Sequence, residues 1–295
     1  MSIVPQTSSA VLSMASNAGN RLPALRLGPT ASDRRLQIRA RPGLRCAPTP
    51  MARRRVTPET GYALRVEKIG YQMFYGPDGA YLYQPIPKCA CTAIKTLLLR
   101  LEGLPVDDNH WRRHQKEFNG FPGTTHLSIE EQLDIFEGRT DTFKFVFVRN
   151  PYARLASIYC DKILVNPTPY LIRQIRKSAA EQGTTLSDRI TFPEFVSVVS
   201  RQSLAEMDPH CRPQYYEGRF GFVKFDFVGR MEAMSRDLTY ALKRIDAPEA
   251  IIARVNERHN VAGSSVELWD TVPAEVKRLF LATYEIDFDL LRYSR

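Results

Sequence analysis

Three short apolar segments that alternate with helix-forming stretches constrain the fold of this 295-residue chain most. They are residues 81–86, 143–148 and 225–228, and they are rich in aromatic and β-branched side chains. Short continuous apolar runs of this kind are typical of strands that are buried on both faces of a parallel sheet. The alternation therefore predicts an α/β fold, a three-layer sandwich whose central parallel sheet is flanked by helices.

Turn and capping signals place the ends of several elements. Residues 76–79 (GPDG) are a strong turn signal, so residues 71–75 are expected to pair with residues 81–86 as a hairpin. Capping boxes that begin at Ser128 and Thr191 predict two helix starts. Residues 104–127 are expected to be a long loop. Further helices are expected at residues 92–102, 152–165, 169–182, 232–244, 248–259 and 273–284.

The positive charge of the chain lies in its first 57 residues. The whole chain has a formal net charge of +9, and residues 1–57 contain ten arginines and a single acid, Asp33. The remaining residues carry 31 basic and 31 acidic side chains, so the body is neutral. A basic excess outside the folded part argues against a nucleic-acid-binding protein.

Residues 1–57 show no sustained helical or strand period and are expected to be an unstructured leader. Three explanations compete: an organelle transit peptide, a tail that binds acidic partners, or an artefact of an upstream start, because Met51 stands just before the body. We favour an artefact or a processed leader. Residues 58–295 are expected to form one domain.

No window of the sequence approaches the run of about 18 apolar residues that a membrane span needs. We therefore expect a cytoplasmic or membrane-peripheral protein, or an organellar one if the leader is a transit peptide. The five cysteines are sparse and odd in number, which does not indicate a disulfide framework. Cys89 and Cys91 have the wrong spacing for a zinc site, and we expect no metal.

A strand, a loop and a helix at residues 81–102 form the first candidate site. Ligands of open α/β sheets bind beyond the carboxyl ends of strands, where a helix start offers N–H groups to a phosphate. Lys88 and Thr92 flank this helix start, and Ala90 and Ala93 are small enough for close approach of a ligand. The glycines of a Walker A motif are absent, and so is a convincing acidic partner for Mg²⁺. The pattern favours a phosphate-bearing ligand bound without metal; the alternative is an ordinary turn with a surface lysine.

Arg149 and Ser157 form the second candidate site. Arg149 follows the strand at 143–148, and Ser157 comes eight residues later on the next expected helix. An arginine at a strand end binds phosphate bidentately, and the serine completes an anion site if the helix packs over the strand end. The alternative is a surface ion pair and a solvent-facing serine.

Together these segments resemble a known family. Residues 87–95 (PKCACTAIK) resemble the 5′-phosphosulfate-binding loop of sulfotransferases that use 3′-phosphoadenosine 5′-phosphosulfate (PAPS), and residues 149–157 (RNPYARLAS) are similar to their 3′-phosphate-binding motif. The most similar group is the carbohydrate sulfotransferases of the family 2 type. This resemblance implies a P-loop-like three-layer sandwich, which agrees with the α/β sandwich expected above. The resemblance runs in order from about residue 81 to 292 and includes residues 208–214, 225–232 and 284–288. The motif around His210 often has Trp at the position of Cys211. The cysteine would therefore lack the stacking contact that a Trp makes.

The resemblance implies roles for individual residues. PAPS would be the co-substrate, and an acceptor hydroxyl would attack its sulfur in line. Arg149 and Ser157 would hold the 3′-phosphate, and His126 is the first choice for the general base, with His114 and His210 next and His110 and His259 also available. His210 and Arg212 are expected to contact the acceptor. The 5′-phosphosulfate would be held by Lys88, which would also be catalytic, and by Cys89, Ala90, Cys91, Thr92 and Ala93.

The resemblance therefore predicts a PAPS-dependent sulfotransferase that acts on a hydroxyl of a carbohydrate or glycan. Two alternatives stay open: an ATP-dependent small-molecule kinase, and a non-catalytic nucleotide- or glycan-binding protein of the same fold. The expected partner is a carbohydrate or another hydroxyl acceptor, with no nucleic acid and no stable membrane span. The sequence leaves the oligomeric state open.

Overall fold

The computed structural model describes residues 72–107, 120–257 and 266–295. The predicted leader and its boundary with the domain lie outside the described residues. The same holds for His110, His114 and His259.

The sheet has four strands in the order β1-β2-β3-β4, and the predicted α/β class is confirmed. β1 runs antiparallel to β2, as expected for a hairpin, whereas β2, β3 and β4 are parallel. The sheet is therefore mixed at one edge and parallel elsewhere. The strands are β1 (Phe74–Tyr75), β2 (Tyr81–Gln84), β3 (Phe143–Val148) and β4 (Phe227–Arg230).

β4 begins two residues later than the sequence predicts. Asp226, which the prediction placed inside the strand, uses its carboxylate to accept hydrogen bonds from the backbone N–H and from Nζ of Lys144, at 2.8 and 2.7 Å. Its own N–H donates to the Lys144 carbonyl. Asp226 thus fixes the entry of β4 beside β3, and the ladder starts at Phe227.

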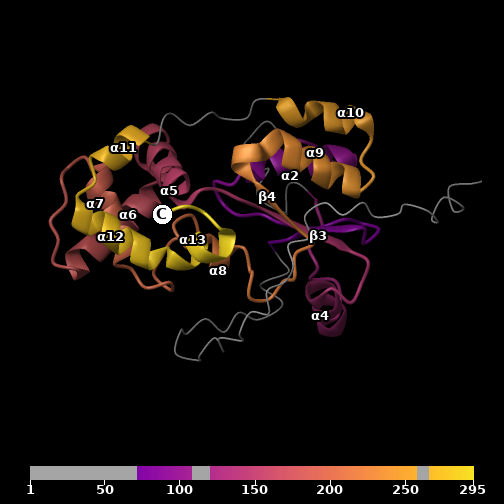
Figure 1. The fold of residues 1–295 in the computed structure, drawn as a ribbon, viewed down its shortest axis with the longest axis horizontal. Coiled ribbons are helices and arrows are strands. Elements are labelled where there is room, and N and C mark those ends of the chain that lie inside the picture. The colour runs from indigo at the N-terminus through magenta and orange to yellow at the C-terminus, as the bar shows by residue number, and fades with distance from the viewer. Residues whose placement is uncertain (1–71, 108–119, 258–265) are drawn as a thin grey trace, which may run out of the picture. The chain divides into compact units, whose positions relative to one another are not determined.

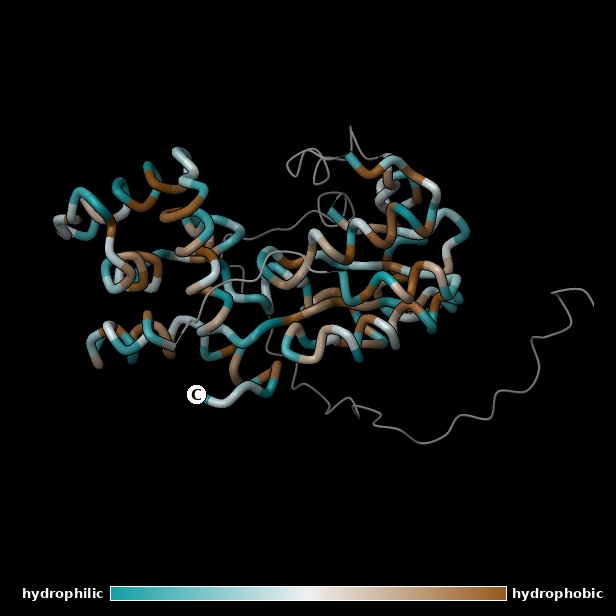
Figure 2. Tube along the Cα trace, turned by 90° about the horizontal axis from the view of Figure 1, so that it is seen from above, coloured by the Kyte–Doolittle hydropathy of each residue, from teal (hydrophilic) through white to brown (hydrophobic). Residues whose placement is uncertain are grey.

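Alternation along β3 divides the core between the two faces of the sheet. Phe143, Phe145 and Phe147 pack with residues of α2 (Cys91–Leu101) and α9 (Met234–Arg244). Val146 and Val148 belong to a cluster on the opposite face with Ile86 and Leu291. Figure 1 shows α2 and α9 beside the strands, and Figure 2 shows apolar strand residues between helices of mixed polarity. Helices therefore flank the sheet as predicted.

Local signals in the sequence place several helix ends correctly. The capping boxes at Ser128 and Thr191 both form, and they open α4 (Ile129–Glu137) and α7 (Phe192–Ser200). Gly138 follows α4 with a φ of 76°, a left-handed conformation that costs glycine little. α6 (Pro169–Glu181) also forms as expected.

A second apolar cluster is built mainly from helices, together with residues of the loops that connect them and with no strand residue. Its members include Leu155, Phe195 and Phe280, all buried. Figure 1 shows these helices gathered together. They are α5 (Pro151–Tyr159), α6, α7, α11 (Val266–Asp270), α12 (Ala274–Thr283) and α13 (Glu285–Leu291).

Three predicted helices are divided in the structure. The helix expected at 152–165 is α5 followed by a π-helix, η4 (Cys160–Val165). The helix expected at 248–259 is α10 (Glu249–Ile252) followed by the 3₁₀ turn η6 (Ala253–Asn256), and its last two residues lie outside the described part. The helix expected at 232–244 begins with the 3₁₀ turn η5 (Met231–Ala233). α8 (Gln214–Glu217), α11 and α13 were not predicted.

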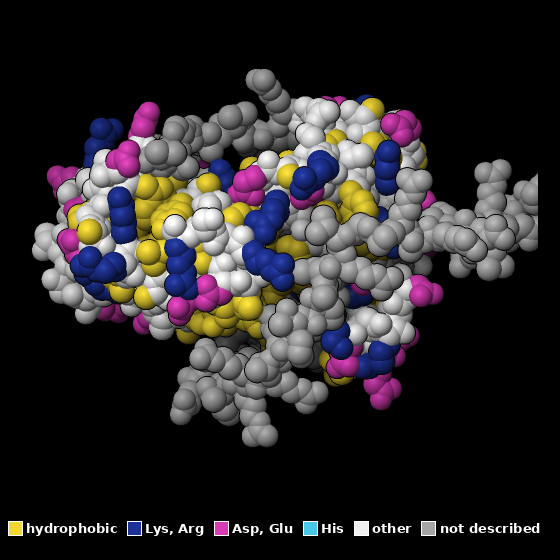
Figure 3. Space-filling model, in the orientation of Figure 1, with side chains coloured by type: hydrophobic (Ala, Val, Ile, Leu, Met, Phe, Trp, Pro, Cys, Tyr) yellow, Lys and Arg dark blue, Asp and Glu magenta, His cyan; other side chains and the backbone are white. Residues whose placement is uncertain are grey.

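Basic and acidic side chains are scattered together over the face of the described residues in Figure 3, in keeping with the neutral body. Among the described residues, no helix is both long enough and apolar enough to span a membrane.

Candidate active site

The two predicted phosphate motifs meet at one edge of the sheet. β2 and β3 are parallel neighbours, with Gln84 opposite Val146, so the loops that follow them leave from the same edge. Nη1 of Arg149 lies 3.4 Å from the carbonyl oxygen of Lys88 and donates to it. The structure therefore brings the loop of Lys88 and the side chain of Arg149 together.

The loop before α2 has an unusual backbone. Lys88 and Ala90 have φ values of 66° and 59°, in the left-handed region that non-glycine residues rarely adopt. Such residues cost free energy and are concentrated at functional sites. Ala90 is also the N-cap of α2, where it offers no side-chain hydrogen bond to the first turn. The backbone N–H groups at the start of α2 have the arrangement that binds anions at helix N-termini.

Cys89 is a structural member of this loop. Its N–H donates to the Ile86 carbonyl, and its buried thiol donates to Oε1 of Gln214 at 3.2 Å. Burial raises the pKa of the thiol to about 12, so it stays protonated. Of the predicted phosphosulfate-binding residues, Cys89 therefore has its amide and its side chain already engaged within the protein.

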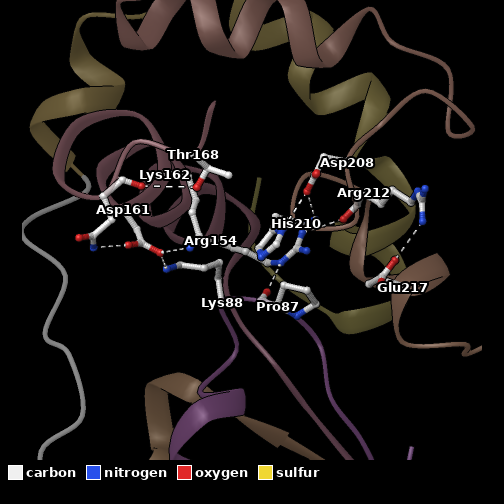
Figure 4. Close-up of polar contacts among 11 residues, drawn as sticks. Pro87, Lys88, Arg154, Asp161, Lys162, Thr168, Asp208, His210, Arg212 and Glu217 are labelled. Carbon is white, nitrogen blue, oxygen red and sulfur yellow. Dashed lines mark hydrogen bonds and ion pairs between the residues drawn. The ribbon is translucent and has the colours of Figure 1, made fainter. Parts of the chain in front are cut away.

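Lys88 is paired with an acid that the sequence did not reveal. Its Nζ lies 2.8 Å from Oδ2 of Asp161, on η4 (Figure 4). Burial opposes ionisation of Asp161, but hydrogen bonds from Asn166 and Lys88, with the charges of Lys88 and Lys162, lower its pKa to about 2. One feature of the sequence could have pointed to Asp161: it follows Ser157 by four residues, the spacing that places two residues on the same face of a helix.

Arg149 has no carboxylate within ion-pair distance among the described residues. Its side chain is half-buried, and burial lowers its pKa from the ordinary value. Asn150, the next residue, caps α5 by accepting hydrogen bonds from the N–H groups of Tyr152 and Ala153. Ser157 lies two turns into that helix with its side chain buried, and its grouping with Arg149 in one phosphate site stays a prediction.

Arg154 joins two loops of the site and was missed by sequence reasoning. Its buried guanidinium donates from Nε to the Pro87 carbonyl at 3.0 Å and from Nη1 to the Arg212 carbonyl at 2.7 Å. Its Nη2 is buried without a hydrogen-bond partner. The loop that carries Lys88 and the loop that carries His210 are thus held by one side chain.

Gln214 is a second unpredicted support. Its side-chain amide accepts from the N–H of Arg149 and donates to the carbonyl of Arg149, both at 2.8 Å. Buried Asp287 in turn accepts from the backbone N–H groups of Gln214 and Tyr215. Burial raises the pKa of Asp287, against the effect of these hydrogen bonds and of Arg154. The segments at 208–214 and 284–288 therefore hold the end of β3 in place.

The predicted acceptor residues lie in the loop after α7. Nδ1 of His210 is 2.7 Å from Oδ1 of Asp208, and the imidazole is 39% exposed. The side chain of Arg212 contacts the Leu204 carbonyl and Glu217. Cys211 is fully buried in the helical cluster, so a side chain at this position faces the core and a Trp there would not stack on a ligand.

His126, the first choice for a base, lies elsewhere on the sheet. It is exposed, and its ring centroid is 6.0 Å from that of Tyr75. Tyr75 pairs with Leu82 near the start of β2, whereas Lys88 follows the end of that strand. The structure therefore does not group His126 with Lys88 and Arg149, and its catalytic role stays a prediction.

The sequence model of the sulfotransferase family matches residues 71–294, which include every strand of the sheet and both phosphate motifs. The chain belongs to the sulfotransferase family. In this sulfotransferase, three cationic side chains lie at the edge of the sheet: Lys88, Arg149 and Arg154. Asp161 is the acid that forms an ion pair with Lys88. No group of three or more His, Cys, Asp or Glu side chains that could hold a metal ion occurs among the described residues.

Its relatives include several named carbohydrate sulfotransferases. The chain is 29% identical over 226 residues to carbohydrate sulfotransferase 14 of Danio rerio, which covers 72% of this chain and 59% of that protein. It is 25% identical over 239 residues to carbohydrate sulfotransferase 11 of Rattus norvegicus, which covers 74% and 65% respectively. The matched region thus spans less than two thirds of these relatives. No solved structure matches the chain.

Proposed function

We propose that this protein transfers the sulfuryl group of PAPS to a hydroxyl group of a carbohydrate. The contact between Arg149 and the loop of Lys88, at the carboxyl ends of two parallel strands, carries the proposal. Family membership and the names of the relatives support a sulfotransferase that acts on carbohydrate.

The unpaired cations of the site fit an anionic co-substrate. Arg149 is half-buried with no carboxylate partner among the described residues, and Nη2 of Arg154 is buried without a partner. A desolvated charge is costly unless an opposite charge reaches it. A nucleotide with phosphates at both its 3′ and 5′ positions supplies such charge, so the residues present fit PAPS.

Different residues of the chain bind different parts of PAPS. PAPS, when bound, supplies an activated sulfuryl group attached to a phosphate leaving group. Lys88 and the amide groups at the start of α2 stabilise the negative charge that grows on the leaving phosphate oxygen. Thr92 hydrogen-bonds the 5′-phosphate. Arg149 and Ser157 hold the 3′-phosphate, which distinguishes PAPS from ATP.

A screen with ³⁵S-labelled PAPS over carbohydrates and small hydroxyl compounds tests the transfer, with labelled product as the readout. Calorimetric titration of 3′,5′-bisphosphoadenosine (PAP) against ATP tests the nucleotide site. We expect PAP to bind more tightly. Tighter binding of ATP would favour the kinase alternative, and PAP binding without transfer to any carbohydrate would favour a non-catalytic binding protein.

A further inference from the structure

An aspartate and a histidine form a dyad beside the Lys88 loop. Oδ1 of Asp208 accepts hydrogen bonds from Nδ1 of the His210 ring at 2.7 Å and from the His210 backbone N–H at 2.9 Å. Asp208 is 12% exposed, whereas the His210 ring is 39% exposed. A carboxylate on Nδ1 selects the tautomer in which that nitrogen carries the proton, so Nε2 keeps its lone pair.

The backbone around the dyad is fixed from several sides. The N–H groups of Cys211 and Arg212 both donate to the Asp208 carbonyl, which closes a tight turn over His210. Cys211 is buried in the helical core, and the hydroxyl of Tyr284 donates to its carbonyl. The imidazole is therefore presented by a rigid support, as precise proton transfer requires.

Arg154 places this turn next to the catalytic loop. One guanidinium reaches the carbonyl of Pro87, adjacent to Lys88, and the carbonyl of Arg212, two residues after His210. Figure 4 shows the His210 ring beside Arg154, with Lys88 to one side and Asp208 to the other. His210 and Lys88 therefore lie in the same part of the site.

We propose that His210 is the general base that accepts the proton of the acceptor hydroxyl, and that Asp208 is its positioning residue. This inference rests on the proposed function. As the acceptor oxygen forms its bond to sulfur, its proton passes to Nε2 of His210. The bond between sulfur and the bridging phosphate oxygen breaks, and its electron pair stays on PAP. The imidazolium is stabilised by Asp208 and returns its proton to water.

Charged groups of this part of the site lie on several elements. Asp208 and Arg212 are on the same turn as His210, Arg154 is on α5, and Lys88 is ion-paired to Asp161 on η4. Asp208 is the acid in direct contact with the ring. Replacing it with Asn removes the charge that stabilises the imidazolium and should shift the acidic limb of the rate profile to lower pH.

The test uses three reactions of the intact protein. Two are forward reactions that need a base: transfer of label from ³⁵S-PAPS to water, and transfer to the carbohydrate found by the screen. The third is the reverse exchange, in which p-nitrophenyl sulfate gives its sulfuryl group to PAP and p-nitrophenolate leaves without needing a proton. His210→Asn keeps an amide nitrogen near the Nδ1 position, so the contact with Asp208 is retained while Nε2 is lost.

We expect His210→Asn to slow both forward reactions about 10²- to 10⁴-fold, the usual contribution of a general base. PAP affinity should stay within about threefold of wild type, and p-nitrophenyl sulfate exchange should fall much less than the forward reactions. Asp208→Asn should give a smaller loss of turnover together with the shifted acidic limb. A purely structural role would instead lower the melting temperature and weaken PAP without moving that limb.

Different results would overturn the assignment of the base and the proposed function. Wild-type turnover in His210→Asn, or a comparable loss in His126→Asn with none in His210→Asn, would overturn the assignment of the base. A wild-type protein that binds no PAP and catalyses neither reaction would overturn the proposed function itself.

Discussion

Lys88 and Asp161 are 73 positions apart in sequence, and their side chains form an ion pair with 2.8 Å between Nζ and Oδ2. The pair joins the loop after β2 to the π-helical turn after α5. π-Helical turns are rare in proteins, and those that do occur are often found at functional sites. The lysine proposed to stabilise the leaving phosphate is therefore ion-paired with an acid of the same site.

Asp161→Asn should strengthen PAP binding. The substitution removes a negative charge that competes with the phosphate for Lys88 and repels the nucleotide. We expect about a tenfold lower Kd by calorimetry, equivalent to about 1.4 kcal/mol. Asp141→Asn, at an exposed acid before β3, is the matched control and should leave Kd unchanged. Weaker PAP binding by Asp161→Asn alone would show that the acid supports the nucleotide site.

Stability should fall in acid as two carboxylates take up protons. Burial raises the pKa of both, but hydrogen bonds from Asn166 and Lys88 lower that of Asp161 from 3.8 to about 2, and bonds from Thr191 and Ser187 lower that of Glu194 from 4.5 to about 2. Because both are depressed in the folded protein, their stabilisation is complete above the unfolded values and is lost as pH falls toward about 2.

The free energy of unfolding, measured by urea unfolding between pH 6 and 2, checks this expectation. The ionic strength is kept constant so that the screening of charges by salt does not change with pH. The slope of the unfolding free energy against pH should flatten in Asp161→Asn and in Glu194→Gln, most of all in the double variant. An unchanged slope below pH 4.5 in the double variant would show that other carboxylates control acid unfolding.

Gln214→Ala should damage both stability and nucleotide binding. The substitution leaves the N–H and carbonyl of Arg149 and the buried Asp287 without their side-chain partner. We expect a loss of about 3 kcal/mol in unfolding free energy and a PAP affinity at least tenfold weaker. Gln202→Ala, at a buried glutamine bonded to Ser178, is the control. It should lose stability while its PAP affinity stays at the wild-type value.

Local rules predicted the parts of the fold that depend on neighbours in sequence. The capping boxes at Ser128 and Thr191 form because a side chain three residues away satisfies the helix start. The positions of Lys88 and Arg149 follow from strands that end just before them in a parallel sheet. These predictions need only short-range hydrogen bonding and the topology of the α/β fold.

The parts that were missed depend on contacts between distant segments. Asp161 reaches Lys88 across 73 positions, and Gln214 reaches Arg149 across 65, because the packing of the helical cluster on the sheet brings them together. η4 was expected to continue α5, since the apolar period does not distinguish the two helix types. The resemblance ranked His126 ahead of His210, and the contact between His210 and Asp208 is visible only in the structure.

Arg149→Ala should weaken PAP far more than 5′-AMP. Arg149 follows β3 directly, its guanidinium is half-buried, and it has no carboxylate partner among the described residues. A charge-assisted hydrogen bond to phosphate contributes about 1.5–3 kcal/mol, so we expect PAP to bind about 10- to 150-fold more weakly. Because 5′-AMP lacks the 3′-phosphate, its affinity should change by less than about threefold.

Arg139→Ala is the matched control for this prediction, since Arg139 is an exposed arginine whose guanidinium pairs with Asp134 and Glu137 outside the site. It should bind both nucleotides like the wild type, which separates a local contact from a general loss of positive charge. Equal losses for PAP and 5′-AMP in Arg149→Ala would mean that Arg149 does not read the 3′-phosphate. In that case the selectivity for PAP over ATP would have to come from Ser157 or from Arg154, the other guanidinium at this edge of the sheet.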